Sequence, residues 1–398
     1  MSTLVIDDEV FVRKLLAHLL GRLGLADVLA CEGGQAGLEL LNTRSDIDLI
    51  FCDLQMPGMD GVEFIRHLVE RNYAGALVLV SGEDERILHT AGRLARAHHL
   101  DVLGEVRKPV TPEELRKVLE RRGTTSMRCA AVRNRQYSAD ELRQALDSRQ
   151  LVNYYQPKVS LETAMFAGVE TLVRWQHPED GLVSPDRFIP LAEENSLIDA
   201  LTHQVLETAL RDMRKLLDGG NAIQVAVNVS MENLRALDFP EYVARTALEA
   251  GVPLAALVLE VTESRLMDDP LSALEILTRL RLKRIGLSID DFGTGHSSLA
   301  QLRDIPFTEL KLDRSFVHGA AHDSSQRAIL DASLDLARQL GISTVAEGVE
   351  DREDWELLRV RGCNLAQGWF ISRPLEAGAL PSWIAAWNAR RGEILGYR

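Results

Sequence analysis

Short apolar runs alternate with amphipathic stretches along residues 1–120. The apolar runs are LVI at 4–6, VLA at 28–30, LIFCD at 49–53, ALVLVS at 76–81 and VLGEV at 102–106. After the first run comes EVFVRKLLAHLLGRL, in which Phe11, Leu15, Leu16, Leu19 and Leu20 recur at helical spacing and predict one buried face. Strands that alternate with helices predict a parallel sheet covered by helices on both faces.

A similar pattern returns at larger scale from residue 151, where eight strand candidates almost all end in a polar residue. They are LVNYYQPKV at 151–159, FAGVE at 166–170, QVAVN at 224–228, LVLE at 257–260, LSIDD at 287–291, ELK at 309–311, STVAE at 343–347 and NLAQ at 364–367. Helical stretches lie between them, such as SQRAILDASLDLARQLG, which ends at Gly341 where a helix cap favours glycine. Eight strands over about 245 residues predict a (β/α)₈ barrel.

The composition is that of a globular protein with two domains. The chain has 398 residues, of which 46% are hydrophobic and 26% are charged. No apolar run approaches the roughly 18 residues of a membrane span, and the N-terminus lacks the pattern of a secretory leader. We therefore expect a cytoplasmic protein without membrane contact. The four cysteines form no C-x-x-C pair, which predicts reduced thiols and not a disulfide frame or zinc site.

Charge is distributed unevenly along the chain, whose net charge is −14. Residues 1–120 have 13 basic and 20 acidic side chains, whereas RRGTTSMRCAAVRNRQ at 121–136 has five basic residues and none that is acidic. This polar segment lacks apolar periodicity, so we predict a linker at 121–137 between domains at 1–120 and 138–398. A tether for nucleic acid is the alternative for this segment. Because both flanking regions are acidic overall, we expect no binding to duplex nucleic acid.

Polar residues end the predicted strands of the first domain. Asp7 and Asp8 follow the first strand, Asp53 ends the third, Ser81 ends the fourth, and Lys108 follows the fifth. In a parallel sheet these ends meet at one edge, where three carboxylates repel one another unless a cation lies among them. Mg²⁺ would meet that need and orient a phosphoryl group for attack by Asp53, with Ser81 and Lys108 in contact with the phosphate.

The segment CDLQMPGMDG at 52–61 and the Lys108-Pro109 pair resemble the receiver domain of two-component response regulators. The resemblance implies a flavodoxin-like (βα)₅ fold and phosphorylation of Asp53 by a sensor histidine kinase. It also implies one Mg²⁺ ion held by Asp7, Asp8 and Asp53. The sequence departs from the family at Glu105, where an aromatic residue is common.

Oxygen-bearing side chains also stand at the strand ends of the second domain. In a barrel these ends converge on one face, so side chains far apart in sequence become neighbours. Oxygen ligands favour Mg²⁺ or Mn²⁺ over zinc, and this many acids predicts two ions suited to in-line displacement at phosphorus. We expect Lys311 to hold or deprotonate the attacking water. The six residues are Glu170, Asn228, Glu260, Asp290, Asp291 and Glu347.

Nine segments within residues 138–390 carry a family resemblance. They are YYQPKV at 154–159, ETLVRWQHP at 170–178, FIPLAEENSLI at 188–198, VNVS at 227–230, LEVTES at 259–264, DDFGTGHSSL at 290–299, LKLDRSFV at 310–317, AEGVE at 346–350 and AQGWFISRP at 366–374. Together they resemble the EAL domain, a phosphodiesterase that linearises the bacterial second messenger cyclic di-GMP to pGpG. The resemblance implies a response regulator whose phosphorylation modulates phosphodiesterase activity or assembly, and a homodimer or higher homo-oligomer.

The resemblance also assigns roles to particular residues. Lys311, Glu347 and Glu170 are the implied catalytic residues, with Lys311 at the water and Glu347 in proton transfer. The loop 292–298 matches a segment that helps to assemble the second metal site and the dimer, with Glu263 as its anchor and His296 where tyrosine is common. The implied ligands are Glu170, Asn228, Glu260 and Asp290 for one metal and Asp291 and Glu347 for the other, with Asp290 as a candidate bridge. The implied contacts to phosphate or guanine are Gln156, Arg174, Asp313, Glu350, Gln367 and Pro374.

A protein kinase and a non-catalytic sensor are the alternatives to a phosphodiesterase. Asp291-Phe292-Gly293 also occurs in protein kinases, but no glycine-rich phosphate loop, Val-Ala-Ile-Lys strand or His-Arg-Asp loop accompanies it. The second alternative is a cyclic di-GMP sensor that binds without cleaving. Such a protein is expected to lack metal ligands or the lysine, whereas this sequence retains both, so the enzyme is favoured.

Overall fold

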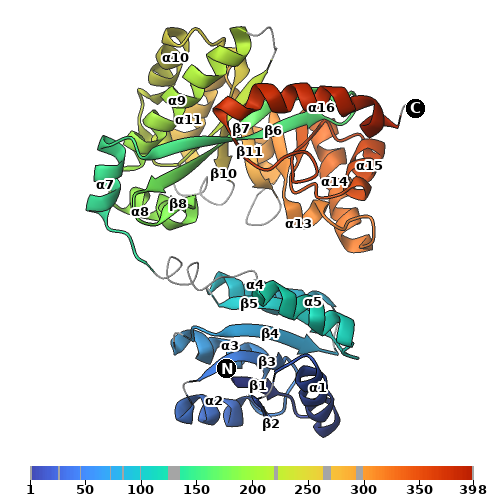
Figure 1. Ribbon diagram of the computed structural model, residues 1–398. Coiled ribbons are helices and arrows are strands. Elements are labelled where there is room, and N and C mark those ends of the chain that lie inside the picture. The colour runs from blue at the N-terminus through green and yellow to red at the C-terminus, as the bar shows by residue number, and fades with distance from the viewer. Residues whose placement is uncertain are drawn as a thin grey trace. The chain divides into compact units, whose positions relative to one another are not determined.

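The computed structural model describes residues 2–25, 27–44, 46–71, 73–82, 85–98, 100–123, 135–218, 223–262, 270–292 and 299–396. The chain divides into two compact units, Met1–Arg135 and Gln136–Arg398 (Figure 1). Within the described ranges, no helix is both long enough and apolar enough to cross a membrane. The predicted linker falls mostly on residues 124–134, which lie outside the described residues.

The first unit contains a parallel sheet with the strand order β2-β1-β3-β4-β5. This order and the alternating helices confirm the predicted flavodoxin-like fold. The strands are β1 (Ser2–Ile6), β2 (Asp27–Cys31), β3 (Ile47–Asp53), β4 (Ala76–Ser81) and β5 (Asp101–Arg107), and the helices are α1 (Val10–Arg22), α2 (Gly34–Thr43), α3 (Gly61–Glu70), α4 (Glu85–Ala97) and α5 (Pro112–Gly123).

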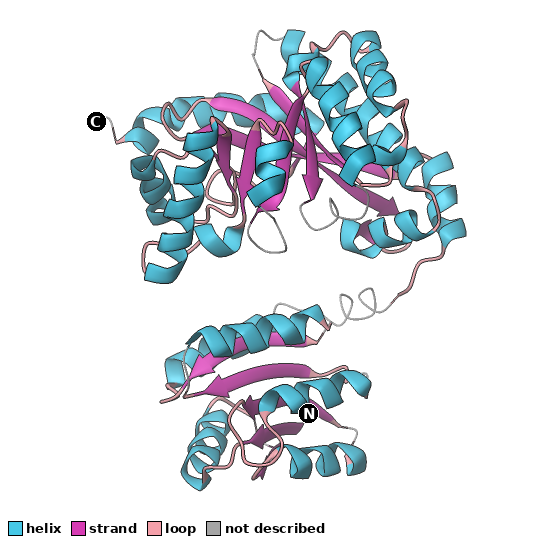
Figure 2. Cartoon of the chain, turned by 180° about the vertical axis from the view of Figure 1, so that it is seen from behind, coloured by secondary structure: helices cyan, strands magenta, loops and turns pink. Residues whose placement is uncertain are grey.

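Helices cover both faces of this sheet (Figure 2). Successive strand residues alternate between two cores, so that Ile50 and Cys52 pack with α2, α3 and α4 while Leu49 and Phe51 pack with α1 and α5. One sequence expectation is wrong here, because Phe11 is 74% exposed and Val12 takes its place in the core. The spacing of Val12, Leu16, Leu19 and Leu20 gives the true buried face of α1.

The second unit closes eight strands into a barrel in the order β6-β14-β13-β12-β11-β10-β9-β7, with β7 pairing back to β6. The predicted barrel and its eight strands are confirmed. Two further short strands, β8 and β15, extend the sheet beside β7 and β6. The bounds are β6 (Leu151–Ser160), β7 (Phe166–His177), β8 (Gly181–Val183), β9 (Gln224–Val229), β10 (Leu257–Thr262), β11 (Gly286–Phe292), β12 (Glu309–Leu312), β13 (Ser343–Ala346), β14 (Leu365–Ala366) and β15 (Leu375–Glu376).

The direction of β6 differs from that of an all-parallel barrel. This strand runs antiparallel to both β7 and β14, whereas the other barrel strands are mutually parallel. Only five residues separate β6 from β7, and so short a connection permits an antiparallel pair but no crossover. The start of β6 therefore lies beside the carboxyl ends of its neighbours, with Leu151 paired to Trp175. Farther along β6, Gln156 is paired in register with Glu170.

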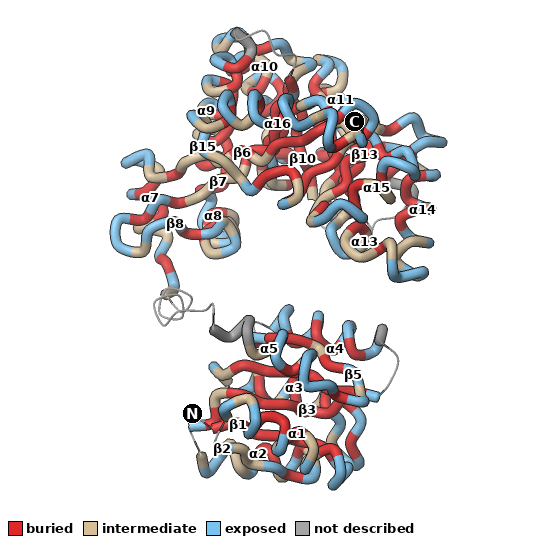
Figure 3. The backbone as a smooth tube through the Cα atoms, turned by 45° about the vertical axis from the view of Figure 1, so that its right-hand side comes forward, coloured by how far each residue is buried: buried red, intermediate tan, exposed pale blue. Residues whose placement is uncertain are grey.

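Helices surround the barrel and expose their outer sides, while the strands are mostly buried (Figure 3). Gly341 ends α14 in a left-handed conformation with φ 67°, as its position in the sequence predicted. Tyr137 precedes the first helix of this unit, and its ring packs on Trp175 with ring centroids 4.8 Å apart. The helices are α7 (Ala139–Asp147), α8 (Ile189–Glu194), α9 (Ile198–Asp218), α10 (Phe239–Glu249), α11 (Pro270–Leu282), α12 (Leu299–Asp304), α13 (Arg314–Val317), α14 (Ser324–Leu340), α15 (Arg352–Arg361) and α16 (Leu380–Leu395).

Candidate active site

The acids of the first unit lie together at the carboxyl edge of its sheet. Asp7 follows β1 and Asp53 ends β3, and both are buried, whereas Asp8 is exposed. One carboxylate oxygen from each of the three lies within 4.8 Å of the others, a spacing that a single metal ion spans. Ser81 ends β4 at the same carboxyl edge of the sheet, and it is fully buried.

Lys108 provides the cation nearest these acids. Its Nζ lies 2.8 Å from Asp7 Oδ2 and 2.7 Å from Asp53 Oδ2. Burial opposes the charge on Lys108, but hydrogen bonds with Asp53 and Asp7 outweigh burial and raise the pKa of the ammonium. Burial raises the pKa of the Asp7 carboxyl, although the hydrogen bond with Lys108 acts in the opposite direction. The structure thus brings together Asp7, Asp8, Asp53 and Lys108 as the sequence indicated.

Glu105, at the position where the receiver family commonly has an aromatic residue, makes polar contacts with α4. One carboxylate oxygen lies 2.8 Å from Arg96 Nη1, and the other lies 3.1 Å from His89 Nδ1. Both partners belong to α4, in which Gly92 makes room for the carboxylate, because a Cβ there would lie 2.0 Å from Glu105 Oε1. An ionic contact between β5 and α4 therefore occupies the position of the aromatic side chain.

The barrel places its candidate ligands on neighbouring strands. Glu170 lies on β7, Asn228 on β9 and Glu260 on β10, and Glu260 is paired in register with Asn228. Asp290 lies on β11, while Glu347 directly follows β13. Because these strands are parallel and adjacent, their acids converge on the carboxyl rim of the barrel.

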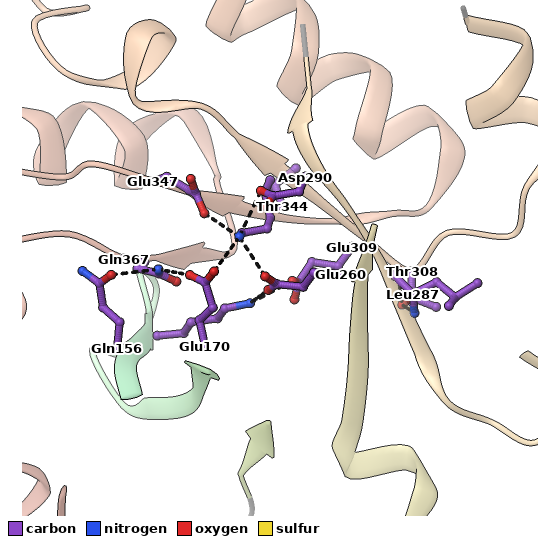
Figure 4. A network of polar contacts seen from close by, with 12 residues as sticks. Gln156, Glu170, Glu260, Leu287, Asp290, Thr308, Glu309, Thr344, Glu347 and Gln367 are labelled. Atoms are coloured by element: carbon purple, nitrogen blue, oxygen red, sulfur yellow. Dashed lines mark hydrogen bonds and ion pairs between the residues drawn. The ribbon is translucent and has the colours of Figure 1, made fainter. Parts of the chain in front are cut away.

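Lys311 on β12 contacts four of these acids. Figure 4 labels the four: Glu170, Glu260, Asp290 and Glu347. Its Nζ is 3.3 Å from Glu170 Oε1 and 2.9 Å from Glu260 Oε2. The same atom is 3.0 Å from Asp290 Oδ1 and 2.7 Å from Glu347 Oε1. One buried ammonium therefore contacts four carboxylates from four different segments.

The crowding of like charges shifts the pKa values of the site. Burial and repulsion from Glu260 raise the pKa of Glu170, and burial with repulsion from Asp290 raises the pKa of Glu347 to about 8, despite Lys311. Burial alone would raise the pKa of Glu260, but two lysines outweigh it and lower that pKa to about 2. Burial opposes the charge on Lys311, yet the surrounding acids raise its pKa well above the usual value. The site has more negative charge than its lysines neutralise.

A chain of amide contacts extends from Glu170 to the middle of β6. Gln367, just after β14, donates from Nε2 to Glu170 Oε2, and the same nitrogen lies 3.2 Å from Gln156 Oε1. Gln156 Nε2 in turn donates to the backbone oxygen of Ser372 at 3.2 Å. Asn228 Nδ2 donates to Glu170 Oε1 at 3.3 Å. Two of the predicted substrate contacts thus adjoin the predicted ligands directly.

The other predicted substrate residues make contacts of their own. Arg174 is half-buried on β7, and burial lowers the pKa of its guanidinium. Asp313 caps α13 by accepting from Ser315 N at 2.9 Å, and Glu350 pairs with Arg314 at 2.7 Å. Pro374 is half-buried between Gln367 and β15. Glu263 and residues 293–298, including His296, lie outside the described residues, as does the side chain of Asp291.

Sequence reasoning overlooked two charged residues of this network, Lys158 and Glu309. Lys158 Nζ lies 2.8 Å from Glu260 Oε1 and 3.0 Å from Glu309 Oε1, and all three side chains are buried. The signal was a lysine inside the apolar strand YYQPKV and a glutamate two residues before Lys311. Charged residues are seldom buried without a partner, so two within predicted strands indicate an internal pair.

The donor set of the rim fits a hard divalent cation. Carboxylate oxygens from Glu170, Glu260, Asp290 and Glu347 surround Lys311, and the amide of Asn228 adjoins Glu170; neither cysteine nor histidine contributes to the described contacts. Mg²⁺ and Mn²⁺ prefer such oxygens. The ammonium of Lys311 among these oxygens shows that the site stabilises positive charge.

Comparison with known families agrees with both sites. Residues 3–120 match the response regulator receiver domain, and residues 139–374 match the EAL domain. The chain is 34% identical over 378 residues to the cyclic di-GMP phosphodiesterase RocR of Pseudomonas aeruginosa, covering 94% of this chain and 96% of that protein.

Other similar proteins match a smaller share of the chain. The chain is 45% identical over 246 residues to the bifunctional diguanylate cyclase and cyclic di-GMP phosphodiesterase MucR of P. aeruginosa, which covers 62% of this chain but only 36% of that protein. The solved PaMucR phosphodiesterase in complex with c-di-GMP superposes with a TM-score of 0.58 at 45% identity, covering 61% of this chain and 98% of that one. The structure of the EAL enzyme Bd1971 with cAMP and cyclic di-GMP has a TM-score of 0.60 at 29% identity, covering 68% of this chain and 74% of that one. The chain therefore belongs to the EAL domain family and has a response regulator receiver domain ahead of the EAL domain.

Proposed function

We propose that this protein hydrolyses cyclic di-GMP to linear pGpG at the carboxyl rim of the barrel. The observation that supports this most strongly is the convergence of four carboxylates on Lys311. The similarity to RocR, named a cyclic di-GMP phosphodiesterase, supports the choice of substrate. A protein that only binds the nucleotide would need neither the clustered acids nor the buried lysine.

The acids of the rim are proposed to hold two Mg²⁺ or Mn²⁺ ions. Such ions neutralise charge on the attacked phosphate and favour ionisation of the attacking water. Glu170, Asn228, Glu260 and Asp290 would hold one ion, while Asp291 and Glu347 would hold the other. The excess of carboxylates over lysines at this rim supports a requirement for added cations.

The residues of the chain then orient the reactants. Lys311 holds the attacking water, and Glu347 accepts a proton from that water. The two side chains are close enough to act together, because Glu347 Oε1 lies 2.7 Å from Lys311 Nζ. The water oxygen bonds to phosphorus as the bond from phosphorus to the ribose 3′ oxygen breaks. That oxygen leaves as a hydroxyl by taking a proton from solvent, to which Glu347 returns the proton it accepted. Gln156, Arg174, Asp313, Glu350, Gln367 and Pro374 are proposed to contact the phosphates and guanines.

Product analysis separates the enzyme from the sensor. Cyclic di-GMP is incubated with the wild-type chain and with Glu170→Gln, which keeps the size of the side chain, and the nucleotides are resolved by chromatography. We expect pGpG from the wild type and at least about 100-fold slower formation from the variant. Binding of cyclic di-GMP by the wild type without any pGpG would establish the sensor instead.

The first domain is proposed to regulate the second through phosphorylation of Asp53. An Asp53 oxygen attacks the phosphorus of a phosphohistidine on a sensor kinase, and the phosphorus–nitrogen bond breaks. One Mg²⁺ held by Asp7, Asp8 and Asp53 supports the transfer, and the close spacing of the three carboxylates supports this assignment. Ser81 and Lys108 then contact the phosphoryl group. The arrangement proposed is a receiver at 1–120, a linker at 121–137 and the EAL domain at 138–398, in a cytoplasmic homodimer or higher homo-oligomer.

A small-molecule phosphodonor tests this regulatory link. Turnover and oligomeric state are measured with and without the donor, for the wild type and for Asp53→Asn. We expect the donor to change one of the two properties in the wild type only. Equal turnover and an equal oligomeric mass in all four samples would contradict regulation through Asp53. Such a result would leave the phosphodiesterase proposal intact.

A further inference from the structure

A second lysine lies inside the barrel, and the proposed reaction gives it no role. Lys158 on β6 is only 4% exposed, and its Nζ lies 2.8 Å from Glu260 Oε1 and 3.0 Å from Glu309 Oε1. A buried lysine is costly unless it is paired, and here it is paired with two carboxylates. Glu309 lies beside Glu260 in the network (Figure 4).

The antiparallel direction of β6 explains where this lysine lies. Gln156 and Lys158 are two residues apart, so both point into the barrel. Because β6 runs against its neighbours, Gln156 lies at the carboxyl rim, and Lys158 lies deeper, toward the amino ends of the other strands. Glu309 is the first residue of β12 and lies at that deeper level, two residues before Lys311.

Glu260 is held between these two levels. Its side chain is fully buried, with Oε1 bonded to Lys158 below and Oε2 2.9 Å from Lys311 above. A carboxylate held by one oxygen cannot turn freely, so its other oxygen keeps a fixed direction toward the rim. Such outer contacts orient the ligands of metal sites and tune their affinity.

We propose that the Lys158–Glu309 pair is a positioning device that fixes Glu260 for metal binding at the rim. The inference rests on the proposed function, because it takes Glu260 to be a ligand there. Glu309 balances the charge of Lys158, so that the lysine anchors Glu260 without adding net positive charge beneath the metal site.

A charge-balanced substitution isolates the positioning effect. Lys158→Met alone would both free Glu260 and remove a positive charge, and these two changes act on cation affinity in opposite directions. Lys158→Met combined with Glu309→Leu removes the pair at constant net charge and keeps similar side-chain volumes. Replacement of buried ion pairs by apolar residues often preserves stability, so we expect the double variant to fold.

The readout is the affinity for Mn²⁺ alone, measured by calorimetry on the full chain. We expect the double variant to bind Mn²⁺ about 10-fold more weakly than the wild type. Turnover at saturating Mn²⁺ should stay within about 3-fold of the wild-type value, because the ligands themselves are intact. Glu309→Asp is the matched control, since it keeps the negative charge that balances Lys158 and leaves the contact of Lys158 with Glu260 in place, and its Mn²⁺ affinity should remain close to that of the wild type.

The outcomes distinguish this inference from the proposed function. A folded double variant with wild-type Mn²⁺ affinity overturns the positioning role, even if the wild type hydrolyses cyclic di-GMP. A wild type that neither binds Mn²⁺ nor forms pGpG contradicts the proposed function itself. If the double variant does not fold, Lys158→Gln with Glu309→Gln replaces it. The glutamine is one bond shorter than lysine and cannot reach Glu260, so the same loss of affinity is expected, and an unchanged affinity contradicts the proposal.

Discussion

Lys311 is the residue on which the electrostatics of the barrel rim depend. It contacts four carboxylates, so Lys311→Met leaves them without their nearest cation. In chelator we expect the free energy of unfolding of the barrel to fall by about 3–5 kcal/mol. Added Mn²⁺ should restore part of that loss, because it supplies positive charge to the same oxygens, while turnover stays at least about 100-fold below the wild-type rate.

Denaturant unfolding with and without Mn²⁺ measures this effect. Lys215→Met is a matched control, because Lys215 pairs with Asp212 at 3.0 Å while its side chain is 71% exposed. Breaking such a surface pair should change stability by less than about 1 kcal/mol. Equal stability of Lys311→Met and the wild type in chelator would show that the lysine does not neutralise the cluster.

The buried thiols give a second prediction at this scale. Burial raises the pKa of Cys363 to about 11 and the pKa of Cys52 well above its usual value. Since the thiolate is the form that reacts, both should resist alkylation in the native protein at neutral pH and react rapidly after unfolding. Mass spectrometry of the labelled peptides distinguishes the two states, and rapid native labelling of either cysteine would contradict its burial.

The position of a functional side chain could be predicted from the sequence where that side chain ends an apolar run. Asp53 could be placed because it ends an apolar run, and parallel strands bring such ends together. Glu170 was expected to end its strand, but β7 continues to His177. Phe11 was misplaced because two overlapping helical spacings fit the same apolar residues of α1, and only packing distinguishes them. Lys158 was missed because its partner depends on the direction of β6.

Close approach of two strands gives a prediction at the scale of elements. Gly168 on β7 faces β9, and a Cβ there would lie 2.4 Å from the backbone oxygen of Gln224. Gly168→Ala must therefore separate the strands that position Glu170 and Asn228. We expect a loss of about 1–3 kcal/mol in barrel stability, measured by denaturant unfolding, together with reduced turnover.

Gly378→Ala provides the comparison for that substitution. Gly378 lies in the same unit, and a Cβ there would meet no heavy atom within 4 Å. It should therefore leave stability and turnover near the wild-type values. If Gly168→Ala behaved like Gly378→Ala, the two strands would not be as close as described.

The elements themselves were largely predictable, and their directions less so. Eight strand candidates followed from apolar runs, and all eight form the barrel. An apolar run looks the same in either direction, so the antiparallel course of β6 was not foreseen from the pattern. The clue was the connection between Ser160 and Phe166, which is too short for the crossover that parallel strands require.

Separation into two units leads to a prediction for the whole molecule. Because each unit has its own hydrophobic core, the fragment 136–398 should fold alone. We expect it to form pGpG at a rate that a phosphodonor does not alter, while the full chain responds. Chromatographic rates for both proteins, with and without donor, provide the comparison. An inactive but folded fragment would mean that the receiver completes the active site.

The central claim is that the acids of the barrel rim cleave cyclic di-GMP with the help of divalent cations. The most direct test is the rate of pGpG formation by the full-length protein in Mg²⁺ or Mn²⁺ and, on the same preparation, in excess chelator. The account predicts sustained turnover with either ion, loss of turnover in chelator, and recovery when the ion is restored. Undiminished turnover in chelator would contradict it.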